Sequence, residues 1–207
     1  MKSLILTEHL QIAVINGQKT QTRRPLNKKD LVPHLLVDEK VREFTAKAHA
    51  QYKKGEIIYL REWFRVHSDL DEVPPRNIIA GSVEYKLGGA INCIGDHIQS
   101  PGRWRWHQTM PAHLARTFLK VTDVRVVQLN EISNEDALAE GINAEYSPSG
   151  MKYWDYQEER FQPMFRGAES FQSLWKSIYG EDAWKENPWV YAYTFQLCDK
   201  EGKELSA

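Results

Sequence analysis

The sequence lacks the features that define several protein classes. Only two of its 207 residues are cysteines, Cys93 and Cys198, and they form no CxxC pair, so we expect no disulfide scaffold. No apolar run approaches the ~18 residues that a membrane-spanning helix needs. The first nine residues turn polar too early for a secretory signal. These absences predict a cytoplasmic protein with reduced thiols and no membrane contact.

The short motifs of common nucleotide and metal enzymes are also missing. The chain contains no GxGxxG, no GxxxxGKS/T and no HExxH, which removes the sequence basis for a Rossmann site, a P-loop or a zincin centre. Cys93, His97, His107 and His113 offer metal-binding side chains, but their spacing matches no compact zinc motif. We therefore expect neither a metal nor a cofactor.

Charge is balanced overall but unevenly distributed. The chain carries 27 Lys and Arg against 28 Asp and Glu, a net charge of −1. Residues 1–65 nevertheless hold 13 basic against 7 acidic residues, and the remainder holds 14 against 21. The near-zero net charge of the whole chain gives no reason to expect a nucleic-acid partner. The basic amino-terminal third, however, is a candidate surface for an anionic ligand.

The hydrophobic pattern predicts an α+β fold. Its periodicity indicates a helix over 7–16, strands over 57–60, 78–85 and 118–129, helices over 133–140 and 171–178, and a strand over 189–197 packed on one face. These strands follow one another without regular βαβ alternation, which argues against a doubly wound sheet. We expect a small mixed or antiparallel β-barrel flanked by helices.

The segment Lys19-Thr-Gln-Thr-Arg-Arg24 concentrates three cations and two hydroxyls directly after a helix stop. In an extended backbone the side chains alternate between two faces. Lys19, Gln21 and Arg23 would then lie on one face, and Thr20, Thr22 and Arg24 on the other. A tight turn would instead bring Lys19 next to Thr22, where a lysine with a lowered pKa can activate a threonine nucleophile. The alternative is a solvated basic loop or a phosphate-contacting patch.

Two carboxylates and one aromatic run are further candidates. Glu140 ends a predicted helix, where its charge opposes the helix dipole; the alternative is an ordinary surface glutamate. Glu62 follows a predicted buried strand, where Arg61, Arg23 and Arg24 are its candidate partners; the alternative to a functional role is a structural ion pair. Arg103-Trp-Arg-Trp-His107 interleaves cations with rings, as base-stacking surfaces do, but Trp and Arg also stack inside ordered loops.

A series of motifs resembles the ASCH domains of the PUA-like superfold, in the form found in phages and prophages. The series opens with Leu10 to Pro25, which ends Gly-x-Lys-Thr-x-Thr-Arg-Arg-Pro. It continues in the family's order with Gly55-x-x-x-Tyr-Leu-Arg-Glu-Trp63, Met110-Pro with Arg116, Val121-Thr-Asp-Val-Arg-Val126, Ile132-Ser-x-Glu-Asp-Ala-x-x-Glu-Gly-Ile142, Phe171-x-x-Leu-Trp175 and Asn187-Pro-Trp-Val190. The resemblance implies one ASCH domain over residues 1–207, with a small β-barrel and a cleft for RNA or a nucleoside-type ligand.

One branch of that family, the small bacterial N4-acetylcytidine amidohydrolases, implies a catalytic set of Lys19, Thr22 and Glu140. In that chemistry Lys19 takes the proton of Thr22, and the threonine oxygen attacks the acetyl carbonyl. Glu140 orients the leaving cytosine amine or delivers a proton to it. An arginine stabilises the oxyanion or a ligand phosphate. The expected ligand or nucleic-acid contacts are Thr20, Arg23, Arg24, Glu62, Trp63, Arg103, Trp104 and Arg116.

The chain departs from that branch because it is much longer. We expect insertions at approximately 26–54, 88–110 and 143–167, which change the cleft and its substrate. Three alternatives therefore stay open: a non-catalytic RNA- or nucleic-acid-binding module, a ribonuclease (including a metal-assisted one), and a phage accessory protein that binds a host protein. The sequence does not determine the substrate or the oligomeric state.

Overall fold

The structure is a computed structural model that describes residues 1–26, 38–79, 81–92, 97–147, 150–153 and 167–205. Parts of all three expected insertions lie outside these ranges. The chain forms two compact units, and each is described by itself. The first unit comprises Met1–Ile15, Ile57–Lys120 and Leu197–Ala207; the second comprises Asn16–Glu56 and Val121–Gln196.

The largest sheet is mixed and has five strands. Its order is β1 (Lys2–Leu4), β3 (Ile57–Leu60), β7 (Phe118–Gln128), β10 (Trp189–Cys198) and β2 (Gln21–Pro25). β1 runs parallel to β3, whereas the β3–β7 and β10–β2 pairs are antiparallel. The predicted α+β class is confirmed. Within the described residues the short strands β1 and β2 remain the two edges of this sheet, so the strands do not close into the expected barrel.

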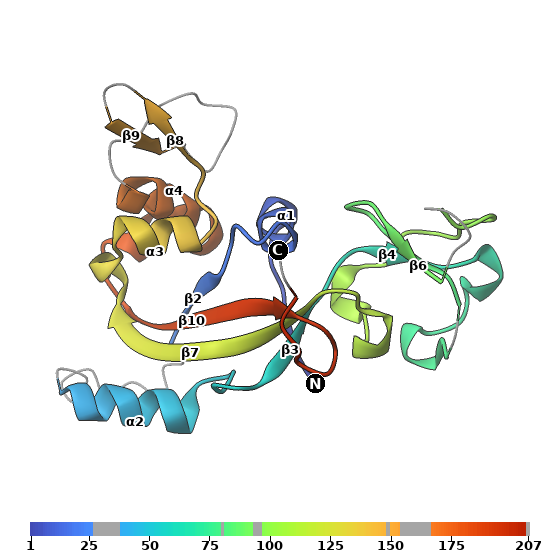
Figure 1. Ribbon diagram of the computed structural model, residues 1–207, viewed down its shortest axis with the longest axis horizontal. Helices are drawn as coiled ribbons and strands as arrows, with labels where there is room; N and C mark the ends of the chain where they lie inside the picture. Colours follow the sequence, from blue (N-terminus) through green and yellow to red (C-terminus); the bar gives the residue numbers. More distant parts are fainter. Residues whose placement is uncertain (27–37, 80, 93–96, 148–149, 154–166, 206–207) are drawn as a thin grey trace. The chain divides into compact units, whose positions relative to one another are not determined.

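The second unit packs helices on both faces of its strands. Figure 1 shows α3 (Asn134–Ala139) and α4 (Gly167–Tyr179) on one side of β2 and β10, and α2 (Glu39–His49) on the other. Residues Val190 to Tyr193 of β10 are consequently all buried. The prediction that this strand packs on one face only was wrong, because alternation of residue size along a strand does not reveal a second covering layer.

The second unit also contains a hairpin that the sequence pattern did not indicate. Strands β8 (Ala144–Ser147) and β9 (Gly150–Tyr153) pair antiparallel inside the expected insertion at 143–167. The neighbouring helix α4 follows its predicted periodicity: Phe171, Leu174 and Trp175 are buried, whereas Ile178 of the same predicted stripe is exposed. Ile178 lies in the last turn of the helix, where the packed stripe ends.

The first unit is built around a small antiparallel sheet with the order β4 (Phe64–Arg65), β5 (Val83–Tyr85) and β6 (Ala90–Ile91). The unit also contains β1, β3 and α1 (Glu8–Ile15), whose predicted C-terminal stop, Gly17, has a φ of 72°. The strand predicted over 78–85 is shorter than expected. A 3-10 turn over Pro75–Asn77 ends at Ile78, because the ring of Pro75 fixes φ at a value that suits a turn.

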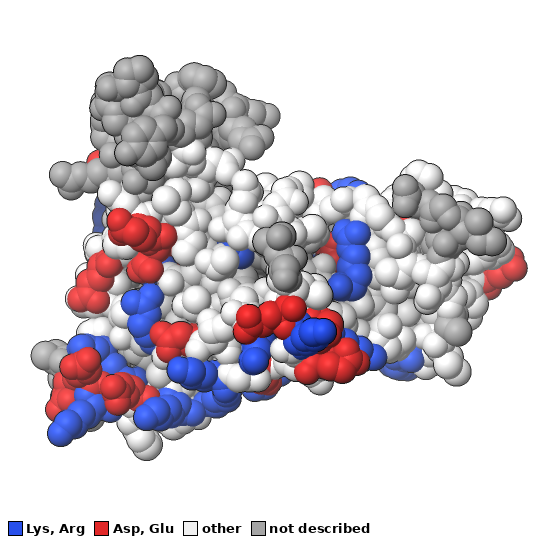
Figure 2. Space-filling model, in the orientation of Figure 1, with Lys and Arg blue, Asp and Glu red and all other residues white. Residues whose placement is uncertain are grey.

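Figure 2 shows how charge is distributed on one face of the molecule. Lysine and arginine side chains lie beside aspartate and glutamate side chains over α2. In the second unit, a groove of about 410 Å³ beside this helix is lined by Lys47, Lys53 and Lys54 together with Glu43 and Asp123. The basic excess of the amino-terminal third therefore does not form a surface of one sign here.

Substitution of Leu119 tests how the core of the first unit is packed. Its side chain on β7 is fully buried, so Leu119→Ala should lower the free energy of unfolding by about 2–5 kcal/mol through lost burial and a residual cavity. Ile79→Ala, at a side chain that is 93% exposed, should change it by less than about 0.5 kcal/mol. Urea unfolding followed by circular dichroism measures both, and equal midpoints for the two variants would contradict this packing.

Candidate functional site

The edge strand β2 separates the candidate residues onto two faces of the sheet. Thr22 pairs with Tyr193 and Arg23 pairs with Ala192 in the β10–β2 register. The Tyr193 hydroxyl accepts a hydrogen bond from the backbone N–H of Gln51, which follows α2, at 3.1 Å. Directly opposed residues share a face of a sheet, so Thr22 faces the side of α2.

The odd-numbered residues of the segment face α3 instead. Gln21 and Arg23 both reach Asp136 of that helix, and Lys19 reaches Glu140 at its end. The parity predicted for an extended backbone is therefore confirmed. The tight turn that would bring Lys19 next to Thr22 is not formed, because Gln21 to Pro25 is a strand.

Helix α3 and its C-terminal cap present two of their carboxylates, Asp136 and Glu140, on one face. The helix begins at the predicted cap, where the Ser133 hydroxyl accepts a hydrogen bond from the backbone N–H of Asp136 at 3.1 Å. Glu140 is its C-terminal cap, four residues after Asp136, and residues four apart lie on the same side of a helix. The backbone N–H of Thr20 donates to the carbonyl oxygen of Ala139 at 2.8 Å, which fixes the segment before β2 against the helix end.

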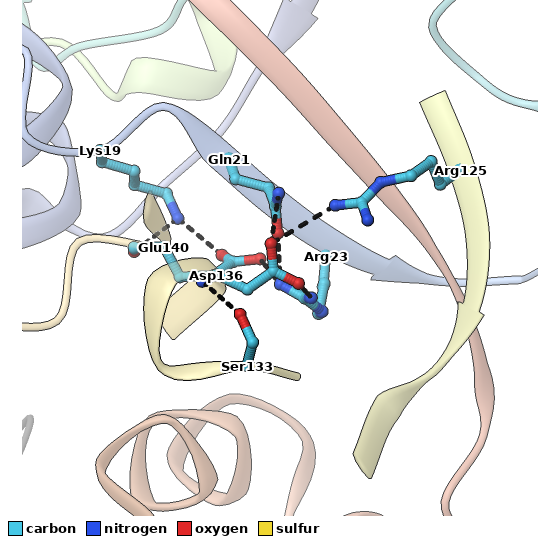
Figure 3. A network of polar contacts seen from close by, with 7 residues as sticks. All are labelled: Lys19, Gln21, Arg23, Arg125, Ser133, Asp136 and Glu140. Carbon is cyan, nitrogen blue, oxygen red and sulfur yellow. Dashed lines mark hydrogen bonds and ion pairs between the residues drawn. The ribbon is translucent and has the colours of Figure 1, made fainter. Parts of the chain in front are cut away.

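Lys19 and Glu140 form a buried ion pair at this point (Figure 3). Lys19 Nζ donates to Glu140 Oε2 at 2.8 Å and to the Glu140 carbonyl oxygen at 2.7 Å. Arg23 Nη1 donates to the other carboxylate oxygen, Oε1, at 3.1 Å. The exposed fractions of the three side chains are 1% for Lys19, 1% for Arg23 and 3% for Glu140. Two cations thus offset the unfavourable position of this carboxylate at a helix C-terminus.

We call this group the Lys19 cluster; it consists of Lys19, Gln21, Arg23, Arg125, Asp136 and Glu140. Gln21, Asp136 and Arg125 were not predicted from the sequence as site residues. Arg23 Nη2 contacts Asp136 Oδ2 at 2.5 Å, and Gln21 Nε2 donates to Asp136 Oδ1 at 3.1 Å. Arg125 of β7 lies 3.4 Å from the same Oδ1 atom. A signal was available for two of them, because Gln21 shares the parity of Lys19 and Asp136 precedes Glu140 by one helical turn. Arg125 carried no such signal.

Burial controls the protonation of Lys19. Desolvation lowers the pKa of Lys19 below its ordinary value of 10.5, and the nearby Arg24 and Arg23 lower it further, while the charge and hydrogen bond of Glu140 act in the opposite direction. Burial also tends to raise the pKa of Asp136, but the charge and hydrogen bond of Arg23 hold that pKa below its ordinary value. A buried lysine that releases its proton more readily beside a carboxylate is a candidate for proton transfer.

The threonines and the second arginine of the segment are not part of this cluster. Thr22 is buried on the α2 side of β2, and Arg24 shares that face because it pairs with Tyr191. Thr20 contributes its backbone to the contact with α3 and, through its carbonyl oxygen, accepts a hydrogen bond from the N–H of Phe195 at 2.8 Å.

Glu62 and Arg116 form a second buried ion pair, in the first unit. Arg116 Nη2 lies 2.6 Å from Glu62 Oε1, and Arg116 Nε lies 3.1 Å from Oε2. The side chain of Glu62 is fully buried, and Arg116 also donates to the carbonyl oxygen of Gly88 at 2.5 Å. Glu62 is thus half of a structural ion pair that holds the loop at Gly88. Its partner is Arg116, and not Arg61, Arg23 or Arg24 as the sequence suggested.

The aromatic candidates Trp63, Arg103 and Trp104 also belong to the first unit. Arg103 Nη2 donates to the carbonyl oxygen of Asp71 at 2.9 Å. Trp104 is partly exposed and lies under the guanidinium of Arg65, at 4.6 Å from ring centroid to Cζ. The Lys19 cluster, in contrast, belongs to the second unit.

Within the described part of the chain, no three His, Cys, Asp or Glu side chains are grouped closely enough to hold a metal ion. Cys93, one of the four metal-binding side chains considered above, lies outside the described residues. A separate search of the described helices finds none that is both long and apolar enough to cross a membrane.

Comparisons with known proteins give little further information. No protein-family model matches the sequence, and none of the curated proteins matches it. Among solved structures, the chain is similar to the crystal structure of protein EF3133 from Enterococcus faecalis V583, described by the family model DUF984. The identity is 12%, the TM-score is 0.41, and the match covers 95% of this chain and 80% of the other.

Removal of the Glu140 charge tests the cluster. Glu140→Gln leaves Lys19 and Arg23 buried without this anion, which should lower the free energy of unfolding by about 3–5 kcal/mol. Glu135→Gln on the same helix changes an exposed side chain and should cost less than about 1 kcal/mol. Thermal and urea unfolding measure both variants. Equal stability of the two would show that the pair is not formed.

The lowered pKa of Lys19 predicts a pH dependence of stability. Between that lowered value and 10.5, the folded protein binds fewer protons at Lys19 than the unfolded chain does. The free energy of unfolding should therefore gain a contribution that increases with pH across this interval. Lys19→Met should remove that contribution, whereas Lys185→Met, at an exposed lysine, should keep it. Urea unfolding at a series of alkaline pH values gives the slopes, and a parental slope in Lys19→Met contradicts the assignment.

Proposed function

We propose that the chain is an ASCH-type protein of the PUA-like superfold that binds RNA or a modified nucleoside and hydrolyses amides of the N4-acetylcytidine kind. Lys19 would accept and return the proton in this reaction, and Glu140 would hold Lys19 in position. The proposal rests on the motif series from Leu10 to Val190 and on one structural observation, the contact between Lys19 Nζ and Glu140 Oε2.

That contact supports the proposal because it combines two properties of acid–base sites. The pair is buried, which lowers the pKa of Lys19 and increases its neutral fraction. The carboxylate is held by Arg23 on its second oxygen, so its position is fixed before any substrate binds. Fixed, desolvated charges of this kind stabilise developing charge more effectively than mobile ones in water.

In the proposed reaction, water rather than Thr22 attacks the amide, since Thr22 lies on the opposite face of β2 from the Lys19 cluster. Neutral Lys19 accepts a proton from the water while the water oxygen bonds to the acetyl carbonyl carbon. The bond between that carbon and the N4 nitrogen then breaks, and the leaving amine takes the proton from Lys19. The products are cytidine and acetic acid, and Glu140 orients Lys19 throughout.

A non-catalytic RNA-binding module is the second candidate, and a specific observation favours it. The cations and carboxylates of the cluster are already paired with one another, and Lys19, Arg23 and Glu140 are almost inaccessible to solvent. Such a closed network also suits a structural role that holds α3 against β2. In this case RNA would bind elsewhere on the chain.

Turnover of free N4-acetylcytidine separates the two candidates. The purified protein should release cytidine, measured by chromatography, and Lys19→Ala should slow this release at least about 100-fold because general-base catalysis is lost. Glu135→Gln is the matched carboxylate control and should react at the parental rate. The reaction should be insensitive to EDTA.

Three results would change the assignment. No cytidine above the Lys19→Ala level from a folded protein rules out the amidohydrolase. RNA binding that persists without turnover then supports the binding module. If Thr22→Val is folded but inactive, the attack belongs to the threonine oxygen and not to water.

A further inference from the structure

The run Arg103-Trp-Arg-Trp-His107 meets strand β4 at one antiparallel bridge, between Phe64 and Arg105, in the first unit. Arg105 N–H donates to the Phe64 carbonyl oxygen at 2.7 Å, and Phe64 N–H donates to the Arg105 carbonyl oxygen at 3.3 Å. Phe64 and Arg105 are thus directly opposed, and both side chains point inward: Phe64 is fully buried and Arg105 nearly so. Arg105 binds the carbonyl oxygens of Val73 (2.7 Å) and Leu70.

The residues that flank this bridge point outward. Side chains alternate along extended backbone, so Trp63 and Arg65 on one side, and Trp104 and Trp106 on the other, face away from the buried Phe64 and Arg105. The contact between the Arg65 guanidinium and the Trp104 ring, at 4.6 Å, agrees with this pairing. Trp104 is 38% exposed and Trp106 is 50% exposed, which is unusual for two indoles so close in the sequence.

A second cation extends the same face. Lys86 follows β5, and its N–H donates to the carbonyl oxygen of Trp63 at 3.0 Å. Its ammonium lies 5.6 Å from the centroid of the Trp63 ring and is partly exposed, beside Glu8. We define the indole face as Trp63, Trp104, Trp106, Arg65 and Lys86.

We propose that the indole face binds single-stranded nucleic acid, with unpaired bases stacked on Trp104 and Trp106. Base stacking on aromatic rings does not depend on sequence, because every base has a π-face. Lys86 and Arg103 are cations near these rings. Each is held in an exposed ion pair, Lys86 with Glu8 at 2.6 Å and Arg103 with Glu72 at 3.7 Å. Exposed ion pairs of this kind are weak, so a phosphate of a stacked strand can replace the carboxylate. A duplex would not suit this face, because its bases are already stacked on each other.

The inference deepens the RNA-binding part of the proposed function and does not depend on the amidohydrolase part. It also divides the run that the sequence singled out: Arg105 is a structural cation, whereas Trp104 and Trp106 are exposed. Arg65 and Lys86, which the sequence did not single out, join the ligand surface. A proline-rich peptide also packs on exposed indoles, but it has no phosphates for the bordering cations. Nucleic acid is therefore favoured because its phosphates can take the place of Glu8 and Glu72 in the exposed ion pairs of Lys86 and Arg103.

Titration with a short unstructured RNA oligonucleotide, followed by fluorescence anisotropy of a label on the RNA, tests the proposal. Trp104→Ala and Trp106→Ala should each weaken binding by roughly 5- to 100-fold, the range for loss of one stacked base. Phe44→Ala removes another exposed aromatic ring, from α2, and should change affinity less than about twofold. Lys86→Gln should reduce the salt dependence of binding, and circular dichroism confirms that each variant is folded.

The outcomes distinguish this inference from the rest of the proposed function. Parental RNA affinity in both tryptophan variants overturns the indole face while leaving RNA binding in place elsewhere. Absence of any RNA binding, or binding of an unlabelled proline-rich peptide in its place, overturns the inference and the RNA-binding proposal together. Turnover of free N4-acetylcytidine is measured without RNA, so the amidohydrolase stands or fails separately.

Discussion

The organisation of the second unit depends on one buried ion pair, Lys19 with Glu140. Placing an ammonium and a carboxylate out of water is costly unless each finds its partner with good geometry. Here the lysine also binds the backbone carbonyl oxygen of Glu140, the residue that caps α3, and Arg23 takes the second carboxylate oxygen. The pair thereby links an edge strand to the end of a short helix, and its desolvation gives Lys19 the lowered pKa on which the proposed chemistry depends.

The same constraint explains which neighbours join the cluster and which do not. Once Gln21 to Pro25 pairs with β10, every second side chain must face α3. Arg23 therefore meets Asp136, and Thr22 is directed to the opposite face, although the two residues are adjacent in the chain. A catalytic scheme taken from motif spacing alone does not include this restriction, which is why water replaces the threonine in the proposed reaction.

In the first unit, the alternation of side chains along an extended backbone also decides the orientation of the run Arg103-Trp-Arg-Trp-His107. Alternating cations and tryptophans are ambiguous in a sequence, since either set can point inward. The backbone hydrogen bonds between Phe64 and Arg105 resolve this ambiguity by burying the arginine. The tryptophans are then left on the outer face, and a pattern with two interpretations becomes a surface with two exposed rings.

Much of the local structure followed from the sequence because local rules were sufficient. The cap at Ser133, the helix stop at Gly17 and the strand over 57–60 were all predicted, since each depends on residues near one another in the chain. The candidates Lys19 and Glu140 were also identified from local chemistry and motif resemblance. Their contact and the recruitment of Arg125 were not predictable in this way. The parity of an extended strand already placed Thr22 opposite Lys19, but the sequence left open whether the segment forms a strand or a tight turn. These features depend on long-range pairing of β2 with β10 and α3, and so does the open sheet found in place of the expected barrel. Residue order alone determined which groups can carry charge or stack, and only the tertiary structure decided which of them meet, because burial and strand register are properties of the packed chain.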